Sequence, residues 1–239
     1  TRLVCLMYAN NESGALQPVE EIASLCRLHS IPMLVDAVQM LGKKALRFND
    51  LGVDFMSLSA HKVGGPNGIG ALLVRRGVKL KELAPGGGQE RGRRSGTENV
   101  PAIAGFSAAL GRVDFSCCES IRDLFEAELV KSLPRAEVVA QQALRTANTS
   151  LVILPGLDGE TLLMQLDLAG FAVASGSACS SGKRDPSHVL LAMGVSEQKA
   201  RSSLRISFSP ENSREDALAL VEALVGADAR LKSMAGISV

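Results

Sequence analysis

The chain has 239 residues, of which 46% are hydrophobic and 21% are charged, so it has the composition of a folded protein with one or two hydrophobic cores. Its 26 Lys and Arg residues nearly balance its 25 Asp and Glu residues, and no strong overall field exists to attract nucleic acid or an anionic membrane surface. We therefore expect neither nucleic acid nor a membrane among its partners.

The cysteines and the N-terminal residues favour a cytoplasmic protein. The five cysteines are an odd number without CxxC spacing, which argues against a disulfide framework and against a structural zinc site. No apolar run is long enough to cross a bilayer, and residues 1–12 lack the zones of a secretory signal. We expect reduced thiols, a cytoplasmic location and no bound metal.

The first part of the chain alternates between strand and helix patterns. Four apolar runs have the length of buried strands: residues 3–9, 32–38, 54–60 and 69–75. Between the first two, apolar residues recur at helical spacing from Val19 to Leu28. A strand, a helix and a strand at this length predict a βαβ unit, which favours a parallel sheet with both faces covered.

The second part has the pattern of a smaller domain. Two helical stretches lie between about residues 98 and 133, and Pro134 ends the second. Strand patterns (150–154, 171–174 and 204–209) then mix with helical patterns (159–168, 186–192 and 213–231). We predict an α/β domain over residues 1–113 and an α+β domain over residues 114–239.

Polar residues follow two neighbouring strands of the predicted sheet. Asp36 and Gln39 follow the second strand, and Ser59, His61 and Lys62 follow the third. Because ligands of open α/β sheets bind beyond the carboxyl ends of the strands, these side chains are candidates for one site. There an aspartate could hold the pyridine nitrogen of a cofactor protonated, while a lysine forms an imine with its aldehyde. Taken singly, these residues also fit a helix cap, a core histidine or a solvated lysine.

Two glycine-rich stretches, 64–70 and 86–88, lack the spacing of nucleotide-binding loops. A dinucleotide or nucleoside-triphosphate site is therefore not expected. We interpret these glycines as residues that permit tight turns and close approach of the backbone to a ligand.

The second part of the chain offers a cysteine and an arginine. Cys179 lies in a Ser- and Gly-rich segment typical of a loop, and Lys183 and Arg184 nearby would favour its thiolate, although free cysteines are often simply packed. In the strand pattern 204–209, alternation turns Arg205 away from the core, where its guanidinium could bind a carboxylate or lie at the surface.

Four segments carry a family resemblance: VDAVQ (35–39), SLSAHKVGGPNGIGALLVRR (57–76), GGGQERGRRSGTENV (86–100) and SGSACSSG (175–182). In this order they resemble the signatures of class V aminotransferase-fold enzymes, and of cysteine desulfurases in particular. The resemblance implies a pyridoxal-phosphate-dependent transferase of fold type I. Residues 1–113 would be the C-terminal portion of the large cofactor-binding domain, and residues 114–239 would be the small domain that carries the catalytic cysteine loop.

The resemblance implies roles around pyridoxal 5'-phosphate. Lys62 matches the Schiff-base lysine, Asp36 the partner of the pyridinium nitrogen, and Gln39 the contact to the phenolic oxygen, while Asn11 matches a residue on that side of the ring that also reaches the substrate.

The resemblance also implies ligands for the cofactor phosphate and a subunit structure. Ser59 and His61 match phosphate ligands, a role that suits a hydroxyl and an imidazole. Thr97 matches a residue that reaches the phosphate of a partner subunit, which implies a homodimer.

The implied reaction converts L-cysteine into L-alanine. Arg205 would hold the substrate carboxylate, Lys62 or His61 would move the α-proton, and Cys179 would take the sulfur as a persulfide. An iron–sulfur scaffold or another sulfur-acceptor protein would then remove the sulfur.

Alternatives stay open at this point. Related enzymes act as selenocysteine lyases or cysteine sulfinate desulfinases, and a shortened chain could serve only as a dimerisation or scaffold-binding module. The family ordinarily has a long segment before ANNE (9–12), with a threonine turn for the phosphate and a histidine that stacks on the ring. We expect that segment to be missing from this sequence.

Overall fold

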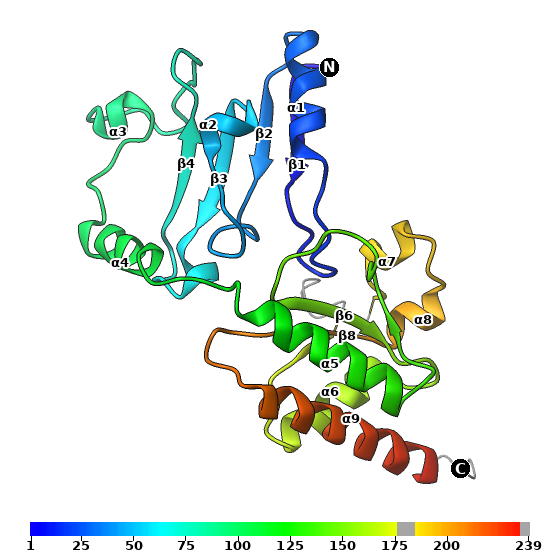
Figure 1. Cartoon of the computed structure of the whole chain (residues 1–239). Helices are drawn as coiled ribbons and strands as arrows, with labels where there is room; N and C mark the ends of the chain where they lie inside the picture. The colour runs from blue at the N-terminus through cyan, green and yellow to red at the C-terminus, as the bar shows by residue number, and fades with distance from the viewer. Residues whose placement is uncertain (176–184, 235–239) are drawn as a thin grey trace. The chain divides into compact units, whose positions relative to one another are not determined.

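The computed structural model describes residues 1–175 and 185–234, which fall into two compact units (Figure 1). The first unit comprises Thr1–Ala9 and Gln17–Asp114, and the second comprises Asn10–Leu16 and Phe115–Val239. These bounds differ from the predicted ones chiefly in the segment Asn10–Leu16, which packs with the second unit.

The first unit is built on a four-stranded sheet in the order β1-β2-β3-β4. Its strands are β1 (Val4–Met7), β2 (Met33–Asp36), β3 (Phe55–Ser59) and β4 (Gly70–Val74). The first three are parallel, and β4 runs antiparallel to β3. The register partners Val35 and Met56 are fully buried. The prediction of a mostly parallel α/β sheet is confirmed.

Helix α1 (Val19–Leu28) makes the crossover from β1 to β2. It buries Val19, Ala23 and Cys26 along one stripe, and Glu20 and Glu21 in its first turn suit the positive end of the helix dipole. The short helix α2 (Phe48–Leu51) follows β2 and ends at Gly52, whose φ of 68° is the left-handed conformation common at helix ends.

The turn after β3 is fixed by the helix that follows the sheet. The 3-10 helix η1 (Ala60–Val63) leads from β3, and after β4 come α3 (Gln89–Gly92) and α4 (Val100–Leu110). Asn99 caps α4, since its side chain accepts a hydrogen bond from the Ala102 amide. Buried Phe106 of α4 packs with Ala60 and Val63, so α4 holds η1 in place.

The second unit has an antiparallel sheet in the order β5-β6-β8-β7. Its strands are β5 (Glu137–Val138), β6 (Thr149–Ile153), β7 (Ala174–Ser175) and β8 (Ser203–Ser207). The helices in its described part are α5 (Cys118–Ser132), α6 (Gly159–Leu168), α7 (His188–Ala192), α8 (Glu197–Arg201) and α9 (Arg214–Met234). This mixture is the α+β arrangement expected for the second part of the chain.

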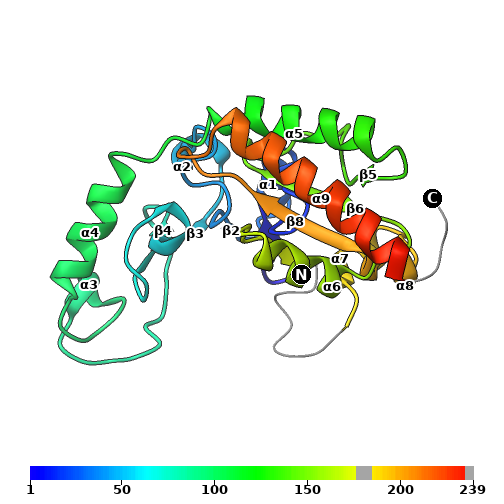
Figure 2. The ribbon, with the colours of Figure 1, turned by 90° about the horizontal axis from the view of Figure 1, so that it is seen from below.

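Both faces of the second sheet are covered. Helices α5 and α9 lie side by side, with α6 against α9 (Figures 1 and 2). Val152 and Leu204 face the core that these helices close, whereas Leu151 and Ile153 pack with Leu190 of α7 on the other face. Strand β6 is therefore buried on both sides, which explains the apolar run from Leu151 to Leu154.

The segment Asn10–Leu16 is tied to the second unit by backbone pairing. The Leu16 amide donates to the Leu144 carbonyl at 2.8 Å, and Ala15 and Arg145 form an antiparallel bridge. Gly14 has a φ of 73°, and a Cβ at this position would lie 2.8 Å from Oγ1 of Thr146. Only glycine fits here without displacing its neighbours.

Among the helices in the described residues, none has the length and apolar character that crossing a membrane would require.

Candidate active site

Two neighbouring strands of the first unit place polar side chains at one edge of its sheet. Asp36 ends β2 and Ser59 ends β3, and these strands are parallel, so their carboxyl ends meet at the same edge. Asp36 is in register with Ser57, and alternation directs Asp36, Ser57 and Ser59 to the face opposite buried Val35. The structure therefore brings Asp36 and Ser59 together, as the strand ends indicated.

The carboxylate of Asp36 is held by its own turn. Its Oδ1 accepts a hydrogen bond from the amide of Val38 at 3.0 Å, in a part-buried position. This local bond fixes the side chain at the strand end. A fixed carboxylate there can stabilise a protonated ring nitrogen.

Ser59 and His61 form a hydrogen-bonded pair. Ser59 Oγ lies 2.7 Å from His61 Nδ1, and the tautomer of the ring decides which group donates. His61 is exposed, so it is not a core histidine in this structure. A hydroxyl and an imidazole side by side can both donate to an anion.

Lys62 extends from a firmly anchored turn. In η1 the two flanking residues Ala60 and Val63 are buried, while His61 and Lys62 are exposed. Gly64 ends the turn with a φ of 76°, a conformation that suits glycine. The amine of Lys62 is thus presented just beyond the carboxyl end of β3.

Gln39 lies in the turn after β2 and contacts a lysine that the sequence patterns did not single out. Its Oε1 accepts a hydrogen bond from Nζ of Lys43 at 2.9 Å. Lys43 is buried, with 8% of its surface exposed, whereas Lys44 is exposed. The spacing of four residues is the one feature that could have suggested this pair.

In the second unit the structure brings Arg205 and Asn11 together. Arg205 lies on β8 between buried Leu204 and Ile206 and is itself half-buried. Its Nη1 donates to the backbone carbonyl of Asn11 at 3.0 Å. The guanidinium is thereby oriented while keeping further donors for a ligand.

The segment around Asn11 is braced by residues that sequence reasoning missed. Asn10 Oδ1 accepts from the amides of Glu12 and Ser13, both at 2.9 Å. The buried carboxylate of Glu12 accepts a hydrogen bond from the hydroxyl of Ser187, the residue that caps α7. These contacts hold the Asn11 carbonyl against Arg205.

Thr97 is exposed in the segment between α3 and α4. Cys179 lies outside the described residues.

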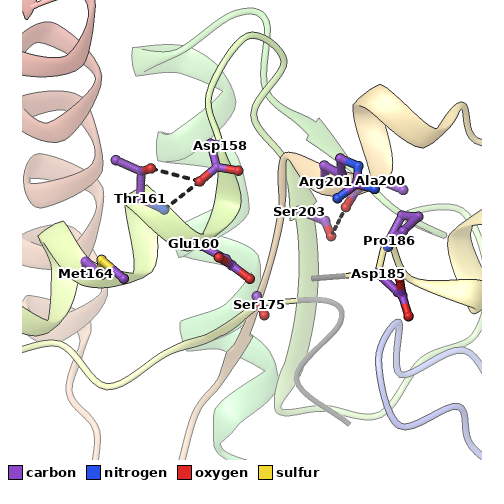
Figure 3. A pocket seen from close by; sticks show the side chains of 10 residues that line it. All are labelled: Asp158, Glu160, Thr161, Met164, Ser175, Asp185, Pro186, Ala200, Arg201 and Ser203. Carbon is purple, nitrogen blue, oxygen red and sulfur yellow. Dashed lines mark hydrogen bonds between the residues drawn. The ribbon is translucent and has the colours of Figure 1, made fainter. Parts of the chain in front are cut away.

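A cavity in the second unit is distinct from the predicted residues. It has a volume of about 390 Å³, and none of the ten described residues that line it was predicted as a site residue (Figure 3). Asp158 Oδ2 accepts from the amide and hydroxyl of Thr161 and so caps α6, and Ser203 Oγ donates to the carbonyl of Ala200. These polar groups serve local structure, and we assign them no part in the chemistry.

Among residues 1–175 and 185–234, no group of three His, Cys, Asp or Glu side chains is arranged to hold a metal ion.

The comparisons with known proteins identify the family. The sequence profile described as Aminotransferase class-V matches residues 1–220. The chain belongs to this family. It is 40% identical over 240 residues to a cysteine desulfurase of Gluconacetobacter diazotrophicus, a match that covers 98% of this chain and 60% of the relative.

Solved structures agree with the sequence relatives. An X-ray structure of a NifS-like protein from Rickettsia africae superposes with a TM-score of 0.85 at 36% identity, covering 95% of this chain and 61% of that one. A structure of SspA in complex with cysteine has a TM-score of 0.75 at 32% identity, covering 89% and 60%. The chain thus spans about 60% of the length of these relatives. The NifS-like neighbours are fold type I enzymes, so the predicted fold type is confirmed.

Enzymes of this family use pyridoxal phosphate, and the groups at the edge of the first sheet fit that cofactor. The cofactor needs a carboxylate for its pyridine nitrogen and a hydrogen-bond donor for its phenolic oxygen. It also needs several donors for its phosphate and an amine for its aldehyde. Asp36, Gln39, the Ser59–His61 pair and Lys62 supply these four kinds of group within one unit.

Proposed function

We propose that this protein is a pyridoxal-phosphate-dependent cysteine desulfurase, which converts L-cysteine into L-alanine and transfers the sulfur to its own cysteine. The observation that carries the proposal is the position of Asp36 and Lys62 at the carboxyl edge of two neighbouring parallel strands. The 40% identity to a cysteine desulfurase supports this reaction within the family. The relatives favour cysteine over selenocysteine or cysteine sulfinate, and an enzyme over a structural module.

In this proposal the edge of the first sheet holds the cofactor. Lys62 binds its aldehyde carbon, Asp36 keeps its ring nitrogen protonated, and Gln39 donates to its phenolic oxygen. Ser59 and His61 bind its phosphate. When bound, the cofactor supplies an electron sink that stabilises negative charge on the substrate carbon.

Thr97 reaches the phosphate of a partner subunit in the proposed enzyme, which is therefore a homodimer. Its exposure in the segment before α4 is compatible with this role.

Arg205 and Asn11 bind the substrate in this proposal. A guanidinium binds a carboxylate through two parallel hydrogen bonds, and Arg205 is already oriented by the Asn11 carbonyl. Cysteine as the ligand is supported by the related SspA, which was solved in complex with cysteine.

The sulfur atom of the substrate moves from its carbon to the sulfur of Cys179, and this transfer needs no external oxidant. Lys62 or His61 transfers the α-proton, and the Cys179 thiolate attacks the sulfur of the substrate. The carbon–sulfur bond breaks, and its electron pair takes up a proton to form a C–H bond. Lys62 or His61 returns the α-proton, and alanine leaves while Cys179 carries a persulfide. An iron–sulfur scaffold or another sulfur-acceptor protein takes the sulfur from Cys179. We place the reaction in the cytoplasm, where thiols such as Cys5 and Cys26, which form no disulfide, are stable.

The experiment measures alanine released from L-cysteine, and the visible absorbance of the purified protein with added pyridoxal phosphate. Lys62→Ala should abolish both signals, whereas Cys179→Ala should keep the absorbance and lose alanine release. Lys44→Ala, at an exposed lysine of the same unit, is the matched control and should retain both. A protein that stays colourless with cofactor contradicts the cofactor assignment, and undiminished alanine release by Cys179→Ala removes the thiol from the reaction.

A further inference from the structure

Lys43 is a buried lysine that the proposed reaction does not use. Only 8% of its surface is exposed, although lysines are almost never buried without a partner, because a buried ammonium loses its hydration. Its Nζ donates to the side-chain oxygen of Gln39 at 2.9 Å. This hydrogen bond joins a buried cation to a residue of the proposed cofactor site.

The turn after β2 fixes the direction of both side chains. The amide of Met40 donates to the carbonyl of Ala37, and the amide of Lys43 donates to the carbonyl of Met40, each at 2.9 Å. These bonds close two consecutive turns, and the hydrogen bond between Gln39 and Lys43 spans them. At Gly42, with a φ of 73°, a Cβ would lie 2.7 Å from both methyl carbons of Val113, so the turn packs tightly against that residue.

The chemistry of the two groups decides how the Gln39 amide is oriented. A carboxamide has an oxygen that only accepts and an NH2 group that only donates, and an ammonium has three donors and no acceptor. Lys43 can therefore bind only the oxygen of Gln39, as the structure shows. The NH2 group is then left to donate on the side away from Lys43.

We propose that Lys43 is a positioning residue that locks the Gln39 amide with its NH2 group available to the phenolic oxygen of the cofactor. This inference rests on the proposed function of Gln39. Without Lys43 the amide can rotate and turn its own oxygen toward the phenolic oxygen, so a donor becomes a repulsive acceptor. Lys43 thus acts on the cofactor through Gln39 and touches neither the cofactor nor the substrate.

A double-mutant cycle separates this role from a general structural one. The affinity of the full chain for pyridoxal phosphate is measured by titration of the visible absorbance for Lys43→Met, Gln39→Ala and the double variant. Methionine has a similar length and no donor. Lys43→Met should weaken binding about tenfold, and the matched control Lys44→Met less than about twofold. In the Gln39→Ala background, Lys43→Met should cost less than a further factor of about two.

Two results of the cycle overturn the inference. One is a tenfold loss from Lys43→Met that persists in the Gln39→Ala background, since Lys43 would then act independently of Gln39. The other is unchanged binding by Lys43→Met. If the unaltered protein binds no cofactor, the proposed function fails instead, and the two failures are therefore distinguishable.

A second readout needs no cofactor. The side-chain NH2 signals of Gln39, assigned in an NMR spectrum by their loss in Gln39→Ala, should move in Lys43→Met and stay in place in Lys44→Met. Lys43→Arg, which keeps a cationic donor, should restore cofactor affinity and is the variant to use if Lys43→Met unfolds. Unmoved Gln39 signals in Lys43→Met, or no rescue by Lys43→Arg in a folded protein, overturn the inference.

Discussion

At the scale of single residues, the candidate site depends on groups whose orientation is set by one or two hydrogen bonds. Asp36 is held by the Val38 amide, the Ser59 hydroxyl by His61, and the Arg205 guanidinium by the Asn11 carbonyl. Such fixed groups need little reordering when a ligand binds, which favours tight and specific binding. Each unit therefore presents its candidate residues in an orientation set by these hydrogen bonds.

Tyr8 offers a direct test of the local electrostatics, because it is the only tyrosine of the chain, which has no tryptophan. Burial, and then the hydrogen bond from its hydroxyl to Glu20 at 2.8 Å, raise the pKa of Tyr8 from 10.0 to about 12. An alkaline titration of the tyrosine absorbance should have its midpoint near pH 12 in the folded protein and near pH 10 in urea. Glu20→Gln should lower the folded midpoint.

The sign of the stability effect follows from the raised pKa. Below pH 10 the neutral phenol contributes its full share to the stability of the fold, and this share is lost as the pH rises from 10 toward 12. A folded midpoint near pH 10 would contradict the assigned environment of Tyr8.

The positions of the site residues on the sheet could be predicted from the sequence, but their partners could not. Asp36 and Ser59 end apolar runs, so the sequence pattern predicts that they lie at the carboxyl edge of a sheet. Arg205 alternates with buried neighbours, so the same kind of pattern predicts the face of the sheet on which it lies. The contact of Glu12 with Ser187 joins residues 175 positions apart, and no local pattern encodes such a pair. Lys43 was missed because a lysine in a turn is usually solvated.

At the scale of elements, long apolar patterns predicted most strands and helices, whereas very short elements and long-range pairings were not predicted. Strand β5 has two residues and α8 has five, which is too few for a periodic signal. The strand predicted over residues 171–174 is displaced in the structure to β7, Ala174–Ser175. The antiparallel direction of β4 follows from its connection, since residues 60–69 are fewer than a parallel crossover needs.

The buried ion pair of the second unit makes a testable contribution at this scale. Arg145, before β6, donates to both carboxylate oxygens of Glu126 on α5, at 2.7 and 2.8 Å, and both side chains are 4% exposed. Glu126→Ala leaves a buried cation unpaired and should lower the free energy of unfolding in urea by about 3–5 kcal/mol.

A second variant provides the control for this pair. The double variant Glu126→Met with Arg145→Met removes both charges and should be close to the unaltered protein in stability. A loss from Glu126→Ala of less than about 1 kcal/mol would show that water or other groups satisfy Arg145.

At the scale of the whole molecule, the two units divide the proposed chemistry between them. The first carries the groups that suit the cofactor, and the second carries Arg205 and the segment with Asn11. That Asn10–Leu16 belongs to the second unit could not be read from the sequence, because the segment follows β1 directly and its pairing with Leu144 and Arg145 is long-range. The change of secondary-structure pattern indicates where one part of the chain ends, but it does not indicate which distant segment packs with that part.

In the proposed function, Lys62 is the residue that binds the cofactor. The most direct measurement incubates the protein with pyridoxal phosphate, reduces it with borohydride, and determines the intact mass and the modified peptide by mass spectrometry. We predict the addition of one reduced cofactor per chain, on the peptide that contains Lys62, and no addition in Lys62→Ala. An adduct that is absent, or that is spread over exposed lysines such as Lys44, would contradict the role proposed for Lys62.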